Sequence, residues 1–199
     1  MSTIARASQP VAWSEGTWTT PPPAAAERDG RLLVTAAEGS DAWRLTSYGF
    51  VHESEHALLA PMPDGTAMEV EFDAAFEAQF DQAGLFVRVD DARWVKAGVE
   101  FSDGDLQLGA VVTDGMSDWS LAPVPEWLGR RITVRVSRSG NALTVRAGAA
   151  GDPLRLVRVI PFAAGLEAAA GPFVCAPTRA GLTVPFASWQ RGPADAALH

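Results

Sequence analysis

Apolar and polar residues alternate along several short segments of this 199-residue chain. The clearest segments are 68–72, 132–136, 143–146 and 182–186. Successive side chains of an extended strand point to opposite faces, so a period of two places all apolar side chains on one face. The alternation therefore predicts short strands, each with one buried face.

Short turn sequences separate these segments: Asp29-Gly30, Asp64-Gly65, Asp103-Gly104, Ser139-Gly140-Asn141 and Gly151-Asp152-Pro153. Strand-length segments joined by such turns are typical of an antiparallel sandwich or barrel. Pro185 interrupts the last segment and has no N–H to donate. We therefore expect that strand to lie at an edge or to be bulged at Pro185.

The length predicts one domain, residues 1–199, with a core over about residues 13–189 and a flexible C-terminal tail at 191–199. The single cysteine, Cys175, excludes an intramolecular disulfide and lies in an apolar strand that favours a buried, inert thiol. No segment approaches the ~18 apolar residues of a membrane span, and residues 1–11 do not resemble a secretory signal. We therefore expect a cytoplasmic protein.

The charge balance restricts the partners. Sixteen basic residues against 24 acidic ones give a net charge of −8, which argues against a nucleic-acid partner or an anionic membrane. Lys96 is the only lysine, and the other basic residues are all arginine.

Residues 81–101 contain the most informative pattern, two predicted strands joined by a short turn. The odd-numbered residues of both strands are apolar and are expected to face the core. Residues paired across an antiparallel ladder share a face, so even-numbered residues must pair with even-numbered ones. Two registers satisfy this condition: Arg88 lies opposite Trp94 or opposite Lys96.

The other face of this hairpin gathers polar and aromatic side chains around Gly84 and Gly98, which would leave a shallow floor. The side chains are those of Gln82, Phe86, Arg88, Trp94, Lys96 and Glu100. Tryptophan can stack on a sugar ring while amide and charged groups bond its hydroxyls. The face therefore predicts a site for a carbohydrate or a similar polar small molecule. The alternative is a solvated face with an ordinary ion-pair network.

A second tryptophan belongs to the same hypothesis. Asp118 and Trp119 follow a predicted turn at Asp114-Gly115, and Trp119 would wall a ligand cleft beside Trp94. Equally, Trp119 would close the end of the core while Asp118 caps backbone groups.

Several ordered motifs resemble one family. They are DQAGLFVR and WVKAGVE in the hairpin, VVTDGMSDWS at 111–120, CAPTRAGLTVPF at 175–186 and WRLTSYGF at 43–50. Together they resemble an uncharacterised family labelled by its fungal regulation-of-enolase member. The resemblance implies an all-β, concanavalin A-like β-sandwich (jelly roll) of two antiparallel sheets, a fold shared by lectins, carbohydrate-binding modules and some glycosidases. The fold alone implies no chemistry.

The segment from His52 to His56 matches the HExxH zinc motif, which needs both histidines on one face of a helix. Pro61 and Pro63 follow closely, so such a helix would be short. We interpret the match as accidental, in a solvated turn, and a metal-binding pair of His52 and His56 is the alternative. We expect no cofactor.

Glu100 is the candidate acid or base if the protein hydrolyses sugars. Glycosidases need two carboxyl groups about 5 Å or about 6.5–9.5 Å apart, and Glu100 has no acidic partner on its own strand. The sequence favours non-catalytic binding, with hydrolysis by Glu100 or a regulatory protein-interaction module as alternatives. It indicates neither the ligand nor the oligomeric state.

Overall fold

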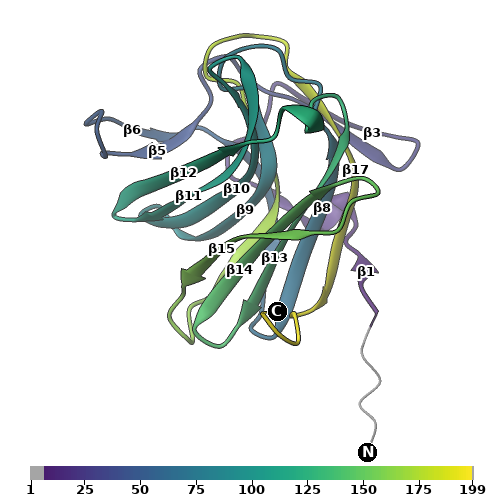
Figure 1. The fold of residues 1–199 in the computed structure, drawn as a ribbon, viewed down its shortest axis with the longest axis vertical. Coiled ribbons are helices and arrows are strands. Elements are labelled where there is room, and N and C mark those ends of the chain that lie inside the picture. Colours follow the sequence, from purple (N-terminus) through teal and green to yellow (C-terminus); the bar gives the residue numbers. More distant parts are fainter. Residues whose placement is uncertain (1–6, 199) are drawn as a thin grey trace, which may run out of the picture.

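The computed structural model describes residues 7–198, and every pair of neighbouring strands in its sheets is antiparallel. Two curved sheets pack face to face as a concanavalin A-like β-sandwich (Figure 1). The first sheet has the order β15 (Arg155–Pro161), β14 (Ala142–Ala149), β13 (Arg131–Ser139), β8 (Thr66–Asp73), β17 (Thr183–Pro193), β4 (Arg31–Thr35) and β3 (Ala24–Arg28), with β1 (Gln9–Pro10) on β17.

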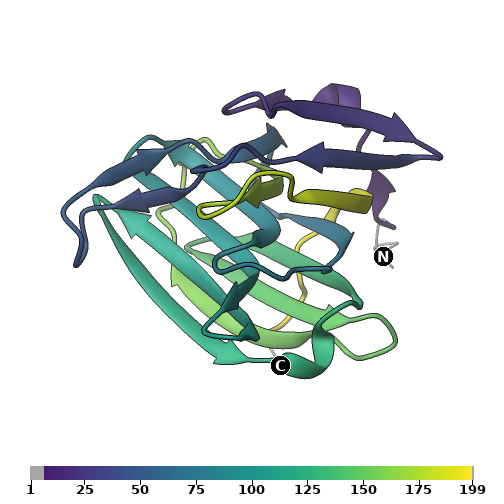
Figure 2. The same cartoon turned by 90° about the horizontal axis from the view of Figure 1, so that it is seen from above.

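The second sheet has the order β12 (Met116–Pro123), β11 (Asp105–Asp114), β10 (Arg93–Ser102), β9 (Gln82–Asp90), β16 (Ala169–Cys175), β7 (His56–Pro61) and β2 (Thr17–Trp18). Within residues 7–198, the other elements are two 3-10 helices, η1 (Trp13–Glu15) and η2 (Pro125–Trp127), and one small sheet. That sheet, β5 (Ala42–Arg44) and β6 (Val51–Glu53), projects from the sandwich (Figures 1 and 2). We call residues 41–54 the arm.

The alternating segments form strands as predicted. They lie in β8, β13, β14 and β17, and their apolar side chains are buried between the sheets. Asp103 and Gly104 both have positive φ angles, 55° and 89°, as the tight turn between β10 and β11 requires. Pro185 pairs with Leu33 of β4, whereas pairing of β17 with β8 begins only at Phe186 and is bulged beyond it. The expectation of an edge or a bulge near Pro185 is confirmed.

The register of the β9–β10 hairpin is the first of the two predicted. Trp94 lies opposite Arg88, and Lys96 lies opposite Phe86. Most of the apolar odd-numbered side chains of β9 and β10 join the main core, as expected. Val89, near the end of β9, does not: it is half-buried and lines a cavity. The opposite face carries a second, smaller apolar cluster, whose buried members are Ala42, Trp43, Ala57, Leu59, Phe86, Trp94, Val111, Phe173 and Cys175.

The C-terminal segment differs from the expectation of a flexible tail. Strand β17 continues to Pro193, and the carboxylate of Asp195 accepts from Arg135 at 2.9 Å and from Arg146 at 3.1 Å. These two arginines face each other across β13 and β14, so a carboxylate between them relieves their repulsion. Residues 191–195 are therefore part of the sandwich.

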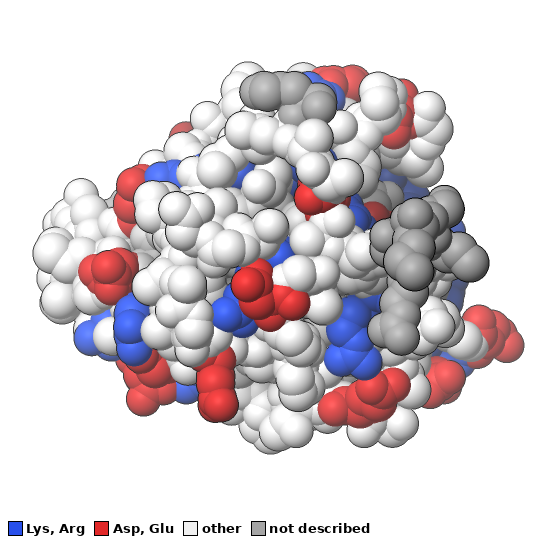
Figure 3. All heavy atoms as spheres, turned by 90° about the horizontal axis from the view of Figure 1, so that it is seen from below, with Lys and Arg blue, Asp and Glu red and all other residues white. Residues whose placement is uncertain are grey.

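Acidic and basic side chains of the described residues are interspersed over the face shown in Figure 3. Within residues 7–198, no helix has the length and apolar character needed to cross a membrane.

Candidate functional site

A cavity of about 340 Å³ lies between the arm and the second sheet. Three polar side chains of the sheet, Gln82 from β9 and Lys96 and Glu100 from β10, line it. Its other lining residues are Gly39, Asp41, Trp43, Tyr48, Phe50, His52, Phe80, Val111, Trp119, Pro177 and Thr178. We call this cavity the arm pocket.

Lys96 is the centre of the polar side of the arm pocket. Its side chain is buried, and Nζ donates to Asp41 Oδ1 at 2.7 Å and to Gln82 Oε1 at 2.9 Å. Burial by itself lowers the pKa of this ammonium, but the charges of Asp41 and Glu100 and the hydrogen bond to Asp41 outweigh it and raise the pKa above its ordinary value. Lys96 is therefore a fixed positive charge, already neutralised by Asp41.

Glu100 lies four positions further along β10, on the same face as Lys96. It is 8% exposed, and its buried Oε1 has no hydrogen-bond partner among the described residues. Burial raises the pKa of this carboxyl to about 7; Lys96 opposes the rise, whereas Asp41 and Asp103 add to it. Both protonation states are therefore accessible near neutral pH.

Aromatic side chains from the arm and from β12 also line the arm pocket. Trp43 meets Trp119 edge to face at 6.0 Å and Tyr48 at 5.7 Å, and Tyr48 stacks on Phe50 at 5.3 Å. Trp119 is 39% exposed and Tyr48 is 60% exposed. Polar groups and aromatic rings lining one cavity are typical of sites for small polar ligands.

The arm reaches this position through a tight turn. Leu45 and Ser47 both have a φ of 62°, a left-handed conformation that costs energy in residues other than glycine. The indole N–H of Trp43 donates to Thr46 O at 3.0 Å, and the Arg44 N–H donates to Ser117 Oγ of β12 at 2.9 Å. These contacts hold the arm against β12 and present Tyr48 and Phe50 at the pocket.

Four of the sequence-predicted ligand residues line the arm pocket: Gln82, Lys96, Glu100 and Trp119. Arg88, Trp94 and Asp118 lie outside it. Trp94 is 5% exposed and stacks on Phe86 at 5.4 Å, within the smaller apolar cluster.

Arg88 and Asp118 have their own charged partners. Arg88 pairs with Asp91 beyond the end of β9, and Asp118 accepts a hydrogen bond from Arg158 at 2.8 Å. Trp94 and Trp119 therefore do not wall one cleft, in contrast to the expectation, because the face around Trp94 is covered.

The shallow floor expected around Gly84 and Gly98 is explained differently by the structure. Gly84 and Gly98 pair directly, as the register requires, but a Cβ atom on Gly98 would lie 2.2 Å from Ala83 O. The glycines thus permit close approach of the two strands.

Sequence reasoning missed the contribution of the arm. The pocket lining includes four residues of the arm, Asp41, Trp43, Tyr48 and Phe50. From the sequence alone, the motif at 43–50 is evidence for the family resemblance and is assigned no part in a binding site. The signal available in the sequence was the concentration of aromatic residues between 43 and 50.

The two histidines occupy different strands, His52 in β6 and His56 in β7, rather than a helix. His56 is buried, and both ring nitrogens are engaged: Nε2 accepts from the Ala37 N–H at 3.0 Å, and Nδ1 lies 2.9 Å from Thr20 O. The expectation of a solvated turn is therefore wrong for His56. Over residues 7–198, no three histidine, cysteine, aspartate or glutamate side chains are grouped as metal ligands.

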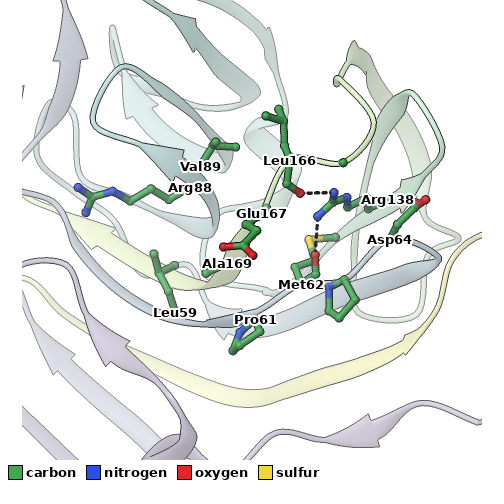
Figure 4. A pocket seen from close by; sticks show the side chains of 13 residues that line it. Leu59, Pro61, Met62, Asp64, Arg88, Val89, Arg138, Leu166, Glu167 and Ala169 are labelled. Atoms are coloured by element: carbon green, nitrogen blue, oxygen red, sulfur yellow. Dashed lines mark hydrogen bonds between the residues drawn. The ribbon is translucent and has the colours of Figure 1, made fainter.

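A larger cavity, of about 750 Å³, opens beside β7, β9 and β13 (Figure 4). The buried Arg138 lies against it and donates to the backbone oxygens of Met62 and Leu166. The Nη donors of this guanidinium connect two loops of the protein, whereas its buried Nε has no hydrogen-bond partner among the described residues. The arm pocket, which combines three buried polar side chains with exposed aromatic rings, is the stronger candidate site.

The fold and this site define the class of the protein: a concanavalin A-like β-sandwich with a partly polar, partly aromatic pocket on one sheet. The chain belongs to the family described as "Protein of unknown function (DUF1349)", which matches residues 18–194. It is 36% identical over 187 residues to "Regulation of enolase protein 1" of Saccharomyces cerevisiae, and the match covers 94% of each chain.

Solved structures share the fold. A functionally unknown protein from Saccharomyces cerevisiae superposes with a TM-score of 0.86 and 34% identity, over 92% of this chain and 98% of that one. A xylan beta-1,4-xylosidase from Bacillus halodurans has a TM-score of 0.67 and 17% identity, over 83% of this chain but 33% of the enzyme. At this identity, the likeness to the xylosidase shows the fold alone.

Proposed function

We propose that this protein is a non-catalytic binder of a carbohydrate or a similar polar small molecule, and that the ligand occupies the arm pocket. One observation carries the proposal: the buried Lys96, Gln82 and Glu100 share a single cavity with exposed aromatic rings. Polar groups in such a cavity orient hydroxyls, and aromatic faces cover the apolar side of a sugar ring.

The size of the arm pocket supports a small ligand. Its volume of about 340 Å³ lies near the lower end of the range of about 300–1,000 Å³ that is usual for small-molecule sites. Asp41 and Gln82 hold Lys96 in place, so the polar side is formed before any ligand arrives. Such preorganisation lowers the entropic cost of binding.

Tryptophan fluorescence during titration with mono- and oligosaccharides tests the proposal, because Trp43 and Trp119 line the pocket. We expect a saturable change with at least one sugar, and at least about tenfold weaker binding in Trp119→Ala. Asp118→Asn is the matched control, since Asp118 neighbours Trp119 but lies outside the pocket. Equal binding by Trp119→Ala and the unaltered protein would place the ligand elsewhere.

Glycoside hydrolysis is a second candidate function, favoured by one observation. Asp41 lines the same pocket as Glu100, and the pKa of Glu100, about 7, suits a general acid. We rank it second because Asp41 is already held by Lys96 and by the Ala42 N–H. Release of nitrophenol from aryl glycosides, abolished in Glu100→Gln, would replace binding with catalysis as the function.

The third candidate, a protein-interaction module, is favoured by the tip of the arm. Leu45, Tyr48, Phe50 and Val51 are all at least 39% exposed. Exposed apolar side chains grouped in this way are found at protein-binding surfaces. Partner capture that is lost in Phe50→Ser, with unchanged sugar titrations, would support this function.

A further inference from the structure

The charges around the arm pocket do not balance. Asp41 and Glu100 supply two carboxyl groups, whereas Lys96 is the single ammonium on the pocket lining. The 2.7 Å ion pair uses Asp41 to neutralise Lys96. Glu100 then remains without an ion-pair partner in the described chain, and its Oε1 also lacks a hydrogen bond. A buried carboxylate in this situation needs a cation or a hydrogen-bond donor.

We propose that the ligand of the arm pocket carries a protonated amine that pairs with Glu100, in the class of amino sugars and other small hydroxylated ammonium compounds. This inference rests on the proposed function, namely that the arm pocket binds a small polar ligand, and it adds the charge of that ligand. The amine supplies the positive charge and the N–H donors that the Glu100 carboxyl lacks.

The aromatic side of the pocket fits the same ligand. Cations bind favourably over the faces of tryptophan and tyrosine, and aromatic groups lining a cavity are a known means of recognising ammonium compounds. Trp43, Tyr48, Phe50 and Trp119 line the same cavity as Glu100. The hydroxyls of the ligand have Gln82 and Lys96 available as polar neighbours.

Anionic ligands are disfavoured by the same arrangement. A phosphate or carboxylate in the pocket would lie near two carboxyl groups, and the one ammonium already donates to Asp41 and Gln82. Specificity arises from such unfavourable pairings as much as from favourable ones. We therefore expect amine, then neutral, then anionic derivatives of one sugar in decreasing order of affinity.

The affinity for amines should also depend on pH. The titratable groups that act on Glu100 are Lys96 on its own strand, Asp41 from the arm and Asp103 from the β10–β11 turn, and His52 stands on the pocket wall. An amine favours the ionised form of Glu100, whose pKa in the free protein is about 7. Binding of an amine that stays protonated over this range, such as ethanolamine, should therefore release a proton and tighten from about pH 6 to about pH 8. An amino sugar, whose own amine loses its proton at about pH 8, should bind most tightly at about pH 7, and a neutral sugar should show no such dependence.

Calorimetric titration of the full chain provides the test. The probes are glucosamine and galactosamine, each compared with its parent sugar, with its N-acetyl derivative and with glucuronate, and ethanolamine serves as a protonated hydroxylated amine without a ring. We expect an amino sugar to bind at least about tenfold more tightly than its parent at about pH 7. Glu100→Gln should remove most of this advantage, so that the amino sugar and its parent bind this variant with affinities within about twofold of each other.

The outcomes separate this inference from the proposed function. Equal affinity for an amino sugar and its parent, or tightest binding of glucuronate, overturns the inference and leaves sugar binding intact. Binding of ethanolamine alone, dependent on Glu100, supports the inference and overturns the carbohydrate part of the proposed function. Absence of binding by every probe overturns both.

Discussion

The Nζ atom of Lys96 lies 2.7 Å from Asp41 Oδ1, and this ion pair joins strand β10 to the base of the arm. The two residues are 55 positions apart in the chain. The pair therefore neutralises the only lysine, and it also fixes the arm, which supplies most of the aromatic residues that line the pocket.

We predict strong coupling between Lys96 and Asp41 in a double-mutant cycle. Asp41→Ala leaves the Lys96 ammonium buried without its counter-ion, because the Lys96 side chain is only 6% exposed. Chemical unfolding of Asp41→Ala, Lys96→Met and the double variant should give a coupling energy of about 2 kcal/mol. Additive losses would show that the pair does not stabilise the arm.

Glu100→Gln should stabilise the protein at high pH. The folded-state pKa of about 7 is above the ordinary value of 4.5, so the folded state binds the proton more tightly than the unfolded state. The loss of unfolding free energy caused by ionising the buried Glu100 carboxyl is absent below about pH 4.5. It grows as the pH rises and reaches about 3 kcal/mol above about pH 7. Gln removes this cost.

Urea unfolding of both proteins at about pH 4.5 and about pH 8 measures the effect. The stability advantage of Glu100→Gln should be larger at the higher pH. A difference that does not change with pH would show that the carboxyl is not desolvated in the folded state.

The two tryptophans that the sequence placed in one cleft should behave differently. Trp94→Ala removes a buried side chain that stacks on Phe86 and should cost about 3–5 kcal/mol of unfolding free energy. Trp119→Ala should cost less than about 1 kcal/mol, because the side chain is partly exposed, yet it should weaken ligand binding. Similar losses of stability in both variants would contradict this division.

Asp195→Asn tests the role of the C-terminal segment. The carboxylate lies between Arg135 and Arg146, so its removal should cost about 1–2 kcal/mol in thermal or chemical unfolding. Asp152→Asn is the matched control, because Asp152 forms a more exposed ion pair with Arg130. Equal, small effects of both substitutions would mean that the segment is not anchored by Asp195.

Much of the fold could be predicted because its signals are local. The alternation in β8, β13 and β14 fixes which side chains face inward, and the turn residues fix where strands reverse. For the β9–β10 hairpin, the same reasoning left two registers. The structure contains the one in which Trp94 pairs with Arg88, a choice that the alternation could not make because both registers keep the apolar sets together.

The site was predicted in part. Gln82, Lys96 and Glu100 share one face of two adjacent strands, so their proximity follows from the period of two alone. Their partners Asp41 and Trp43 come from a projecting arm, and no local pattern indicates where such an arm will lie.

The sequence by itself determined the strands, their buried faces and the polar row that contains the lone lysine, because these depend on neighbouring residues and on the alternation of side chains. Only the tertiary structure decided which part of that row is open. Trp94 is 5% exposed, stacks on Phe86 and borders a cavity of only about 120 Å³, whereas the arm leaves a cavity of about 340 Å³ beside Lys96 and Glu100. The physical reason is that a cavity depends on contacts between distant segments, such as Lys96 with Asp41, and these form only when the whole sandwich is assembled.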